Sequence, residues 1–170
     1  IGTLYEYIGS KEDILYLVCD AVYEEVMEKW KQLMDKNLQG LPRLLQIIDA
    51  YFHVIDEMQD EVLVMYQETK SLPKDALKYV FEKELRMKKV FENEFYECRK
   101  QGLIDLNDEE ISLASHNILV AGHMLTFRRW AIQKDLDFDT YRKMQISMLL
   151  QGFRLHNIKD FQNVLSHTQS

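Results

Sequence analysis

The 170-residue sequence has few of the residues that interrupt helices, with two prolines and six glycines. This scarcity favours long helices over a fold of short strands and tight turns. Its two cysteines, Cys19 and Cys98, lack the paired spacing of a disulfide framework or a zinc site, which indicates reduced, buried thiols in a cytoplasmic protein. No apolar run approaches the roughly 18 residues of a membrane-spanning helix, and no signal-peptide pattern is visible, so we expect no membrane partner.

Positive charge is also scarce in this chain. It has 21 Lys and Arg against 28 Asp and Glu, which gives a net charge of −7. An acidic chain of this kind is a poor general binder of nucleic-acid phosphates. If the protein binds DNA, much of the basic surface is therefore expected in residues that precede Ile1.

The signatures of common catalytic and cofactor sites are missing as well. The sequence has no Gly-rich phosphate loop and no nucleophile at a strand-to-helix turn. None of the five histidines follows a Glu by three residues, as di-iron bundles require, and His116 and His123 lie two helical turns, roughly 10 Å, apart. We therefore expect that the protein is not an enzyme and that it binds no metal ion and no cofactor. A helical enzyme whose site is assembled from distant residues stays open as an alternative.

Apolar residues recur at the three-and-four spacing of amphipathic helices along nearly the whole chain. The segments 40–42, 71–73 and 101–102 contain the Pro and Gly residues that break this pattern, and Asn107 with Glu110 predicts a capped helix start. The sequence therefore predicts an all-α fold. The expected helices cover about residues 10–36, a stretch that begins at residue 42, and residues 61–70, 74–100, 108–134 and 139–153.

Residues 2–15, at the start of the chain, form the most informative motif. Gly9 permits a tight turn, and Ser10 followed by Asp13 has the spacing of a helix N-cap. The motif predicts that a short helix ends within residues 1–9 and that a long helix starts at residue 10. We place a domain boundary there: residues 1–9 end one domain, whose earlier helices are expected upstream, and residues 10–170 form the next.

This motif resembles the recognition helix and junction of TetR-type transcription repressors, in which a Gly-Thr-x-Tyr-x-Tyr-aromatic run precedes a Lys. Ile8 departs from the pattern, because an aromatic residue is usual at that position. The resemblance implies a homodimer that binds operator DNA with the help of the missing helices. The positions that it assigns to DNA contact are Gly2, Thr3, Tyr5, Tyr7 and Lys11.

The last two predicted helices are apolar on more than one face, so they need two burial partners. In TetR-like proteins these helices pair with their symmetry mates as a four-helix bundle, and small residues such as Ala121 would let another helix approach closely. The alternative is a monomer that buries both helices in its own core. The residues predicted at the dimer interface are Ala114, Ile118, Ala121, Gly122, Leu125, Met144, Met148 and Gly152.

Aromatic and Met residues are abundant on the middle helices, where TetR-like proteins hold their inducer. Plain core packing is the alternative role for any one of them. The predicted ligand-binding residues are Phe52, Met65, Tyr66, Phe91, Phe95, His116, Asn117, His123, Met124 and Phe127. Their chemistry favours a small hydrophobic effector, first a fatty acyl chain or acyl-thioester whose anionic head meets Arg128 or Arg129. A flat cationic compound that pairs with Glu68 is the second choice.

Together these observations predict a ligand-responsive transcription repressor that binds operator DNA as a dimer and is released by a small apolar inducer. Two other classes stay open. One is a helical small-molecule-binding protein without a DNA role, for which the opening motif is a chance match, and the other is an enzyme on a helical scaffold.

Overall fold

The computed structural model describes residues 10–35 and 37–152, and every regular element in these ranges is a helix. The all-α prediction is therefore confirmed. The elements are α2 (Lys11–Leu33), α3 (Gly40–Glu57), α4 (Gln59–Glu68), the short 3₁₀ helix η1 (Thr69–Ser71), α5 (Lys74–Lys100), α6 (Asp108–Phe127), α7 (Arg129–Asp135) and α8 (Phe138–Gly152). The domain boundary predicted at residue 10 falls at the edge of the described residues and stays a prediction.

Two helix starts have the caps that the sequence predicts. The amide of Asp13 donates to Ser10 Oγ at 3.1 Å, which fixes the start of α2. At α6, the amide of Glu110 donates to Asn107 Oδ1, and the amide of Asn107 donates back to the Glu110 carboxylate, both at 2.9 Å. Each cap satisfies amides that have no partner within the first helical turn.

The predicted helix over residues 108–134 is wrong in one respect, because the chain breaks at Arg128 into α6 and α7. Arg128 leaves the helical region with φ −115° and ψ 15°. Neither Pro nor Gly marks this position, so the local sequence carries no signal of the break. One contact at the break comes from elsewhere in the fold, because Arg129 pairs with Asp60 of α4 at 2.9 Å. Another is local, because the guanidinium of Arg128 lies over the Trp130 ring.

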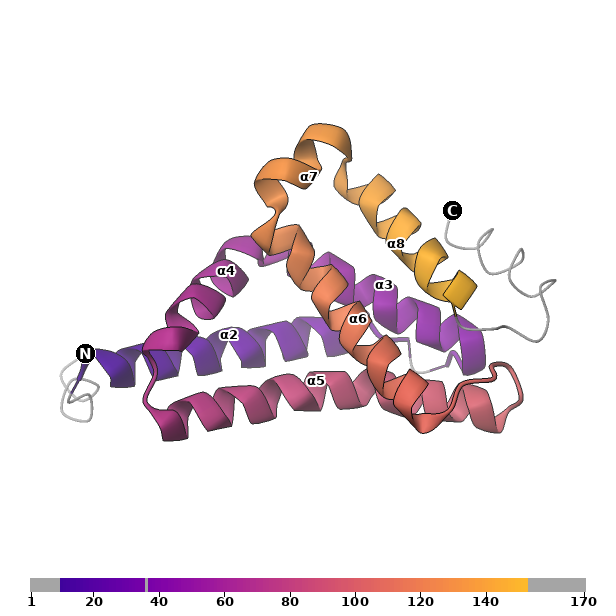
Figure 1. Cartoon of the computed structure of the whole chain (residues 1–170), viewed down its shortest axis with the longest axis horizontal. Helices are drawn as coiled ribbons and strands as arrows, with labels where there is room; N and C mark the ends of the chain where they lie inside the picture. The colour runs from indigo at the N-terminus through magenta and orange to yellow at the C-terminus, as the bar shows by residue number, and fades with distance from the viewer. Residues whose placement is uncertain (1–9, 36, 153–170) are drawn as a thin grey trace.

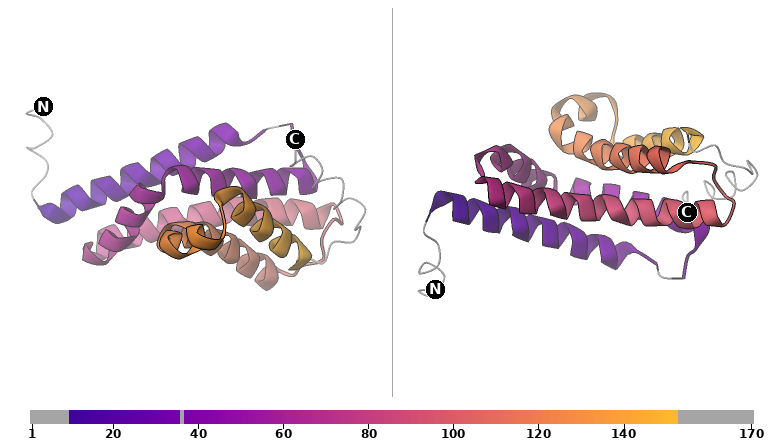
Figure 2. Two further views of the ribbon diagram at one scale, coloured as in Figure 1. Left: turned by 90° about the horizontal axis from the view of Figure 1, so that it is seen from above. Right: turned by 60° about the horizontal axis from the view of Figure 1, so that its bottom comes forward.

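The helices are stacked in layers around one core. Figure 1 shows α2 and α5 running lengthwise, with α6 crossing α3 and α5 at an angle. In the right-hand view of Figure 2, α6, α7 and α8 lie on one side of α5 and α2 lies on the other. Helix α8 packs on α3 and, to a smaller extent, on α6.

Aromatic rings from several helices fill the centre of the core. Trp30 of α2 lies 4.9 Å from the ring of Phe91 on α5, and Tyr51 of α3 lies 5.4 Å from Phe91. Trp30 Nε1 donates to the carbonyl of Ile47, and the Tyr51 hydroxyl donates to the carbonyl of Leu119 on α6. These bonds satisfy the polar atoms of two fully buried rings, so the rings bury their apolar area without an unpaired donor.

The two cysteines are buried free thiols, as predicted, and burial raises the pKa of both. Within residues 10–35 and 37–152, no helix is long and apolar enough to cross a membrane.

Candidate functional site

The residues assigned to DNA contact lie at the edge of the described chain. Gly2, Thr3, Tyr5 and Tyr7 fall outside the described residues, and Lys11 is the first residue of α2 but its side chain is not described. Their assignment therefore stays a prediction. Just beyond them, the first turns of α2 expose the apolar side chains of Ile14, Leu17 and Val18.

Four of the predicted ligand-binding residues belong to the packed core. Phe52, Phe91 and Phe95 are fully buried, and Met65 is 4% exposed. The ring of Phe52 lies 6.0 Å from Tyr51, within the same aromatic core. Packing is the role that these contacts support, and a ligand would reach the rings only by opening the core.

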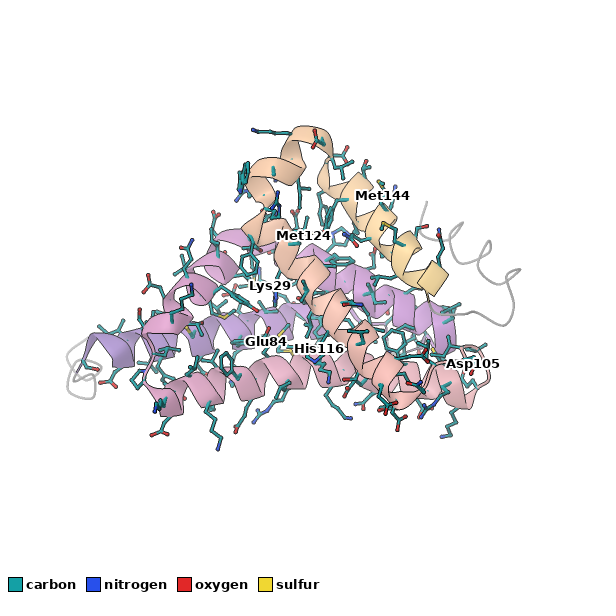
Figure 3. All side chains as sticks on the ribbon, in the orientation of Figure 1. Lys29, Glu84, Asp105, His116, Met124 and Met144 are labelled. Atoms are coloured by element: carbon teal, nitrogen blue, oxygen red, sulfur yellow. The ribbon has the colours of Figure 1, made fainter. Side chains whose placement is uncertain are left out.

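A second group comes together around a polar cluster formed by Tyr66 of α4, Glu84 of α5 and His123 of α6. The Tyr66 hydroxyl donates to Glu84 Oε1 at 2.9 Å and lies 3.3 Å from His123 Nδ1. His123 Nδ1 and Glu84 Oε1 are 4.0 Å apart. Figure 3 labels Glu84 on α5 and Met124 on α6, one residue beyond His123. One tyrosine hydroxyl therefore joins three helices.

Burial sets the protonation state of this cluster. It lowers the pKa of His123 to about 4, so the imidazole is neutral at pH 7. Burial, followed by the negative charge of Glu84, raises the pKa of Tyr66 and of Tyr23 on α2. The cluster at neutral pH is thus a carboxylate among un-ionised rings from several helices.

Aromatic and apolar side chains wall the cluster on its α6 side. The Phe127 ring stands edge-on to Tyr66 at 4.6 Å and is 40% exposed. Met124 is half-buried and packs against the core. The structure therefore brings together four predicted ligand residues, which are Tyr66, His123, Met124 and Phe127.

The remaining two predicted ligand residues lie elsewhere. His116 and Asn117 are exposed on α6, and Figure 3 labels His116 on this helix well away from Met124. Asn117 instead lines a surface hollow of about 280 Å³ between α6 and α8, together with Leu113 and Met148. The structure does not bring these two residues into the cluster.

The polar residues considered as ligand anchors also separate. Arg128 and Arg129 are exposed at the junction of α6 and α7. A separate hollow of about 630 Å³, lined by His53, Asp49 and Asp56 among others, contains none of the predicted ligand-binding residues. Glu68, at the end of α4, is half-buried. Within the described ranges, no group of three or more His, Cys, Asp or Glu is placed to hold a metal ion.

Glu84 is a site residue that the sequence reasoning misses, although a signal is present. It stands in the apolar stripe of α5, four residues after buried Val80 and three before buried Met87. A carboxylate at a core position of a helix is unusual, because burying a charge has a cost. This break in the stripe is the signal, but Lys83 and Glu92 of α5 are also charged and are more deeply buried, so it does not single out Glu84.

The predicted dimer-interface residues separate by helix. The five on α6 are buried in this chain's own core, and they are Ala114, Ile118, Ala121, Gly122 and Leu125. Two of them are already in close contact with other parts of this chain. A Cβ on Gly122 would clash with the Tyr51 ring, and the Tyr141 hydroxyl donates to the carbonyl of Ala121, so neither residue faces the surface. The three on α8, which are Met144, Met148 and Gly152, are exposed.

The apolar surface of α6 lies on the opposite side of the helix from those five residues. Leu113 and Val120 are 61% and 62% exposed, and Phe127 continues the same helical spacing at seven-residue intervals. Trp130 of α7 and Met148 of α8 are 68% and 65% exposed. The structure thus leaves an apolar face, which we call the α6–α8 face, made of Leu113, Val120, Trp130, Met144 and Met148. Phe127 is counted with the polar cluster, where its ring contacts Tyr66.

Comparison with known proteins identifies the family. Residues 38–127 match the family described as Tetracyclin repressor-like, C-terminal domain. The chain belongs to the TetR family. The TetR resemblance of the opening motif and the match to the helical body therefore agree, although they rest on different residues.

Individual relatives of this TetR chain agree with the assignment. The HTH-type transcriptional regulator HbdR of Aromatoleum sp. (strain CIB) is 26% identical over 156 residues, which are 89% of this chain and 66% of HbdR. A regulatory protein of the tetR family from Rhodococcus RHA1 has the same fold, with a TM-score of 0.77 at 18% identity over 92% of this chain and 80% of that one. The ketosteroid transcriptional regulator KstR2 of Mycobacterium tuberculosis gives a TM-score of 0.65 at 18% identity over 90% and 78%.

Proposed function

We propose that this TetR chain is the larger part of a ligand-responsive transcription repressor that binds operator DNA as a dimer. The observation that carries the proposal is the position of α2. Its first residue, Lys11, belongs to the set assigned to DNA contact, and the helix packs against α3, α4 and α5. A ligand that moves α4, α5 or α6 relative to α2 would change the spacing of the two DNA-reading motifs. A preference of about 1–3 kcal/mol for one arrangement is a typical coupling.

The α6–α8 face is the surface that we propose for the dimer. Its apolar side chains are contiguous in register along α6 and continue onto α8, and an exposed apolar face of this kind is typical of a protein interface. A two-fold axis would place the same face of a second copy against it. This assignment keeps the last two long helices, α6 and α8, as the dimer interface that the sequence predicts. On α6 it replaces the buried residues of that prediction with the exposed ones.

For the effector, we propose a small apolar molecule bound at Tyr66, Met124 and Phe127, with a fatty acyl chain or acyl-thioester as the first class to test. Arg128 directly follows Phe127, and its exposed guanidinium is the cation that we propose for the anionic head of such a chain. The fold neighbour KstR2 is a ketosteroid transcriptional regulator, and a steroid has an apolar body too. Decanoyl and hexadecanoyl thioesters should raise the melting temperature of this chain saturably, because a ligand that binds the folded state stabilises it.

The experiment that tests the repressor function uses the full-length protein on DNA selected in vitro from a random pool. We expect specific binding that an effector weakens. Lys11→Ala should weaken binding to all sequences and reduce the salt slope by about one, because it removes one phosphate contact. Lys31→Ala, at the far end of α2, is the matched control.

The 170-residue chain that starts at Ile1 should bind no DNA specifically. If the full-length protein also selects no sequence from the pool, the repressor proposal is wrong. A helical small-molecule-binding protein without a DNA role would then be the better assignment.

A further inference from the structure

The carboxylate of Glu84 is the feature of the polar cluster that packing alone does not explain. Its side chain is 27% exposed, and the imidazole beside it is neutral at pH 7. The neighbouring cations face other partners: Lys83 pairs with Asp20 at 2.7 Å and with Glu24, and Lys88 pairs with Glu92 at 2.9 Å. In the parts of the chain that the structure describes, no Lys or Arg reaches Glu84.

The hydrogen bonds of the cluster leave acceptor capacity on this carboxylate. Tyr66 has one hydroxyl proton, which it donates to Glu84 Oε1, so its contact with His123 Nδ1 is a hydrogen bond only in the tautomer that carries the imidazole proton on Nδ1. A carboxylate accepts about four hydrogen bonds, and within residues 10–35 and 37–152 the Tyr66 hydroxyl is the one donor that reaches Glu84.

Apolar rings surround this acceptor. Tyr66 is half-buried, Phe127 is 40% exposed and the Glu84 side chain is 27% exposed, so solvent reaches the edge of the cluster. A ring-walled site with one strong acceptor binds an apolar body that presents one donor. It also discriminates against the same body without the donor, because the carboxylate would then lose water and gain no partner.

We infer that the Tyr66–Glu84–His123 cluster recognises a hydrogen-bond donor, a hydroxyl or an ammonium group, on an otherwise apolar effector. This inference rests on the proposed function and narrows its effector class. The donor binds the carboxylate of Glu84, and the Tyr66 and Phe127 rings hold the apolar body. An ammonium group adds charge pairing and ring-face attraction to the hydrogen bond.

A matched set of probes tests the inference by calorimetry on the 170-residue chain. The probes are para-butylphenol, para-butylbenzylamine and para-butylanisole, which share one body and differ in a hydroxyl, an ammonium and a donor-free ether. We expect the first or second to bind at least about tenfold more tightly than the ether. Binding of the phenol alone identifies a neutral donor, and tighter binding of the amine identifies a cation.

Variants then locate the acceptor. Glu84→Gln should weaken the favoured probe roughly ten- to a hundredfold and leave the ether unchanged, because Gln still accepts from Tyr66 but carries no charge. Glu82→Gln, exposed two residues earlier on α5, is the matched control. Tyr66→Phe should keep or strengthen donor binding, because it removes the competing hydroxyl.

Several outcomes would overturn the inference: equal affinity for the phenol and the ether, an equal loss of all probes in Glu84→Gln, or no saturable binding of either donor probe. Release of operator DNA by the full-length protein distinguishes the failure of the donor site from the failure of the proposed repressor function. Release by apolar compounds with no effect of Glu84→Gln would refute the donor site alone. Glu84-dependent binding without release would refute the effector response alone.

Discussion

Replacing Gly122 by Ala should destabilise this chain, although Ala is ordinarily the better helix residue. A Cβ at this position would clash with Tyr51 Cε1 and would lie 2.9 Å from both Cζ and the hydroxyl oxygen. Tyr51 is fully buried, and its ring contacts Trp30 and Phe91 in the aromatic core. It cannot retreat without disturbing those rings, so the new methyl overpacks the centre of the molecule.

The magnitude follows from three terms. Overpacking a core typically costs about 1–3 kcal/mol. Displacement of Tyr51 also weakens its 3.1 Å hydrogen bond to the carbonyl of Leu119, which is worth about 1 kcal/mol. Ala in place of Gly within a helix returns about 1 kcal/mol. The free energy of unfolding should therefore fall by about 1–3 kcal/mol.

Urea denaturation followed by circular dichroism measures this change. Gly152→Ala is the control, because a Cβ on Gly152 meets nothing within 4 Å. It should be neutral or stabilising by up to about 1 kcal/mol. If Gly122→Ala is as stable as Gly152→Ala, the close packing of α6 on Tyr51 is not as described. If Gly122→Ala instead dissociates a dimer and leaves the stability of the subunit unchanged, Gly122 lies at the subunit interface.

Three further changes test other parts of the molecule. Val120→Glu on the α6–α8 face should halve the particle mass measured by light scattering at micromolar concentration, whereas Val64→Glu, on an exposed part of α4, should not. The pKa of His123 is about 4 in the folded chain, against 6.5 for an ordinary His. The neutral, buried imidazole therefore contributes its full stabilisation of the fold above pH 6.5. It is lost at roughly 1.4 kcal/mol per unit as the pH falls toward 4, since the unfolded chain binds the proton first. His123→Gln should flatten this slope in urea titrations, and His116→Gln should leave it unchanged. Lys83→Met should lower the free energy of unfolding by about 2 kcal/mol by leaving two carboxylates of α2 without their cation, and an unchanged melting temperature would contradict this.

The helical architecture could be predicted from the sequence because its signals are local. The predicted helix over residues 74–100 agrees with α5, and the caps at Ser10 and Asn107 are present. The break at Arg128 could not be predicted, since no Pro or Gly marks it and Arg129 pairs with Asp60 of α4 through the tertiary structure. Periodicity reports what one segment prefers, and this break depends on what lies beside the segment.

The candidate site shows a similar limit. The small residues of α6 do indicate close approach, but the group that approaches Gly122 is Tyr51 of the same chain. A pattern of small side chains does not say which partner fills the space. Residue type alone points to Tyr66 and His123, whereas Glu84 escapes the same reasoning because a charged residue is ordinarily assigned to the surface.

Lys83 and Glu84 are neighbours on α5, and successive residues of an α-helix point about 100° apart. Lys83 faces Asp20 and Glu24 on α2, whereas Glu84 faces Tyr66 and His123. Lys83, which pairs with the helix that leads to the DNA motif, is therefore directly bonded along the chain to Glu84, the acceptor that we assign to the effector. A genetic screen for mutants that bind effector yet stay on DNA should accordingly recover substitutions at Lys83, Asp20 and Glu24, none of which belongs to the assigned effector site.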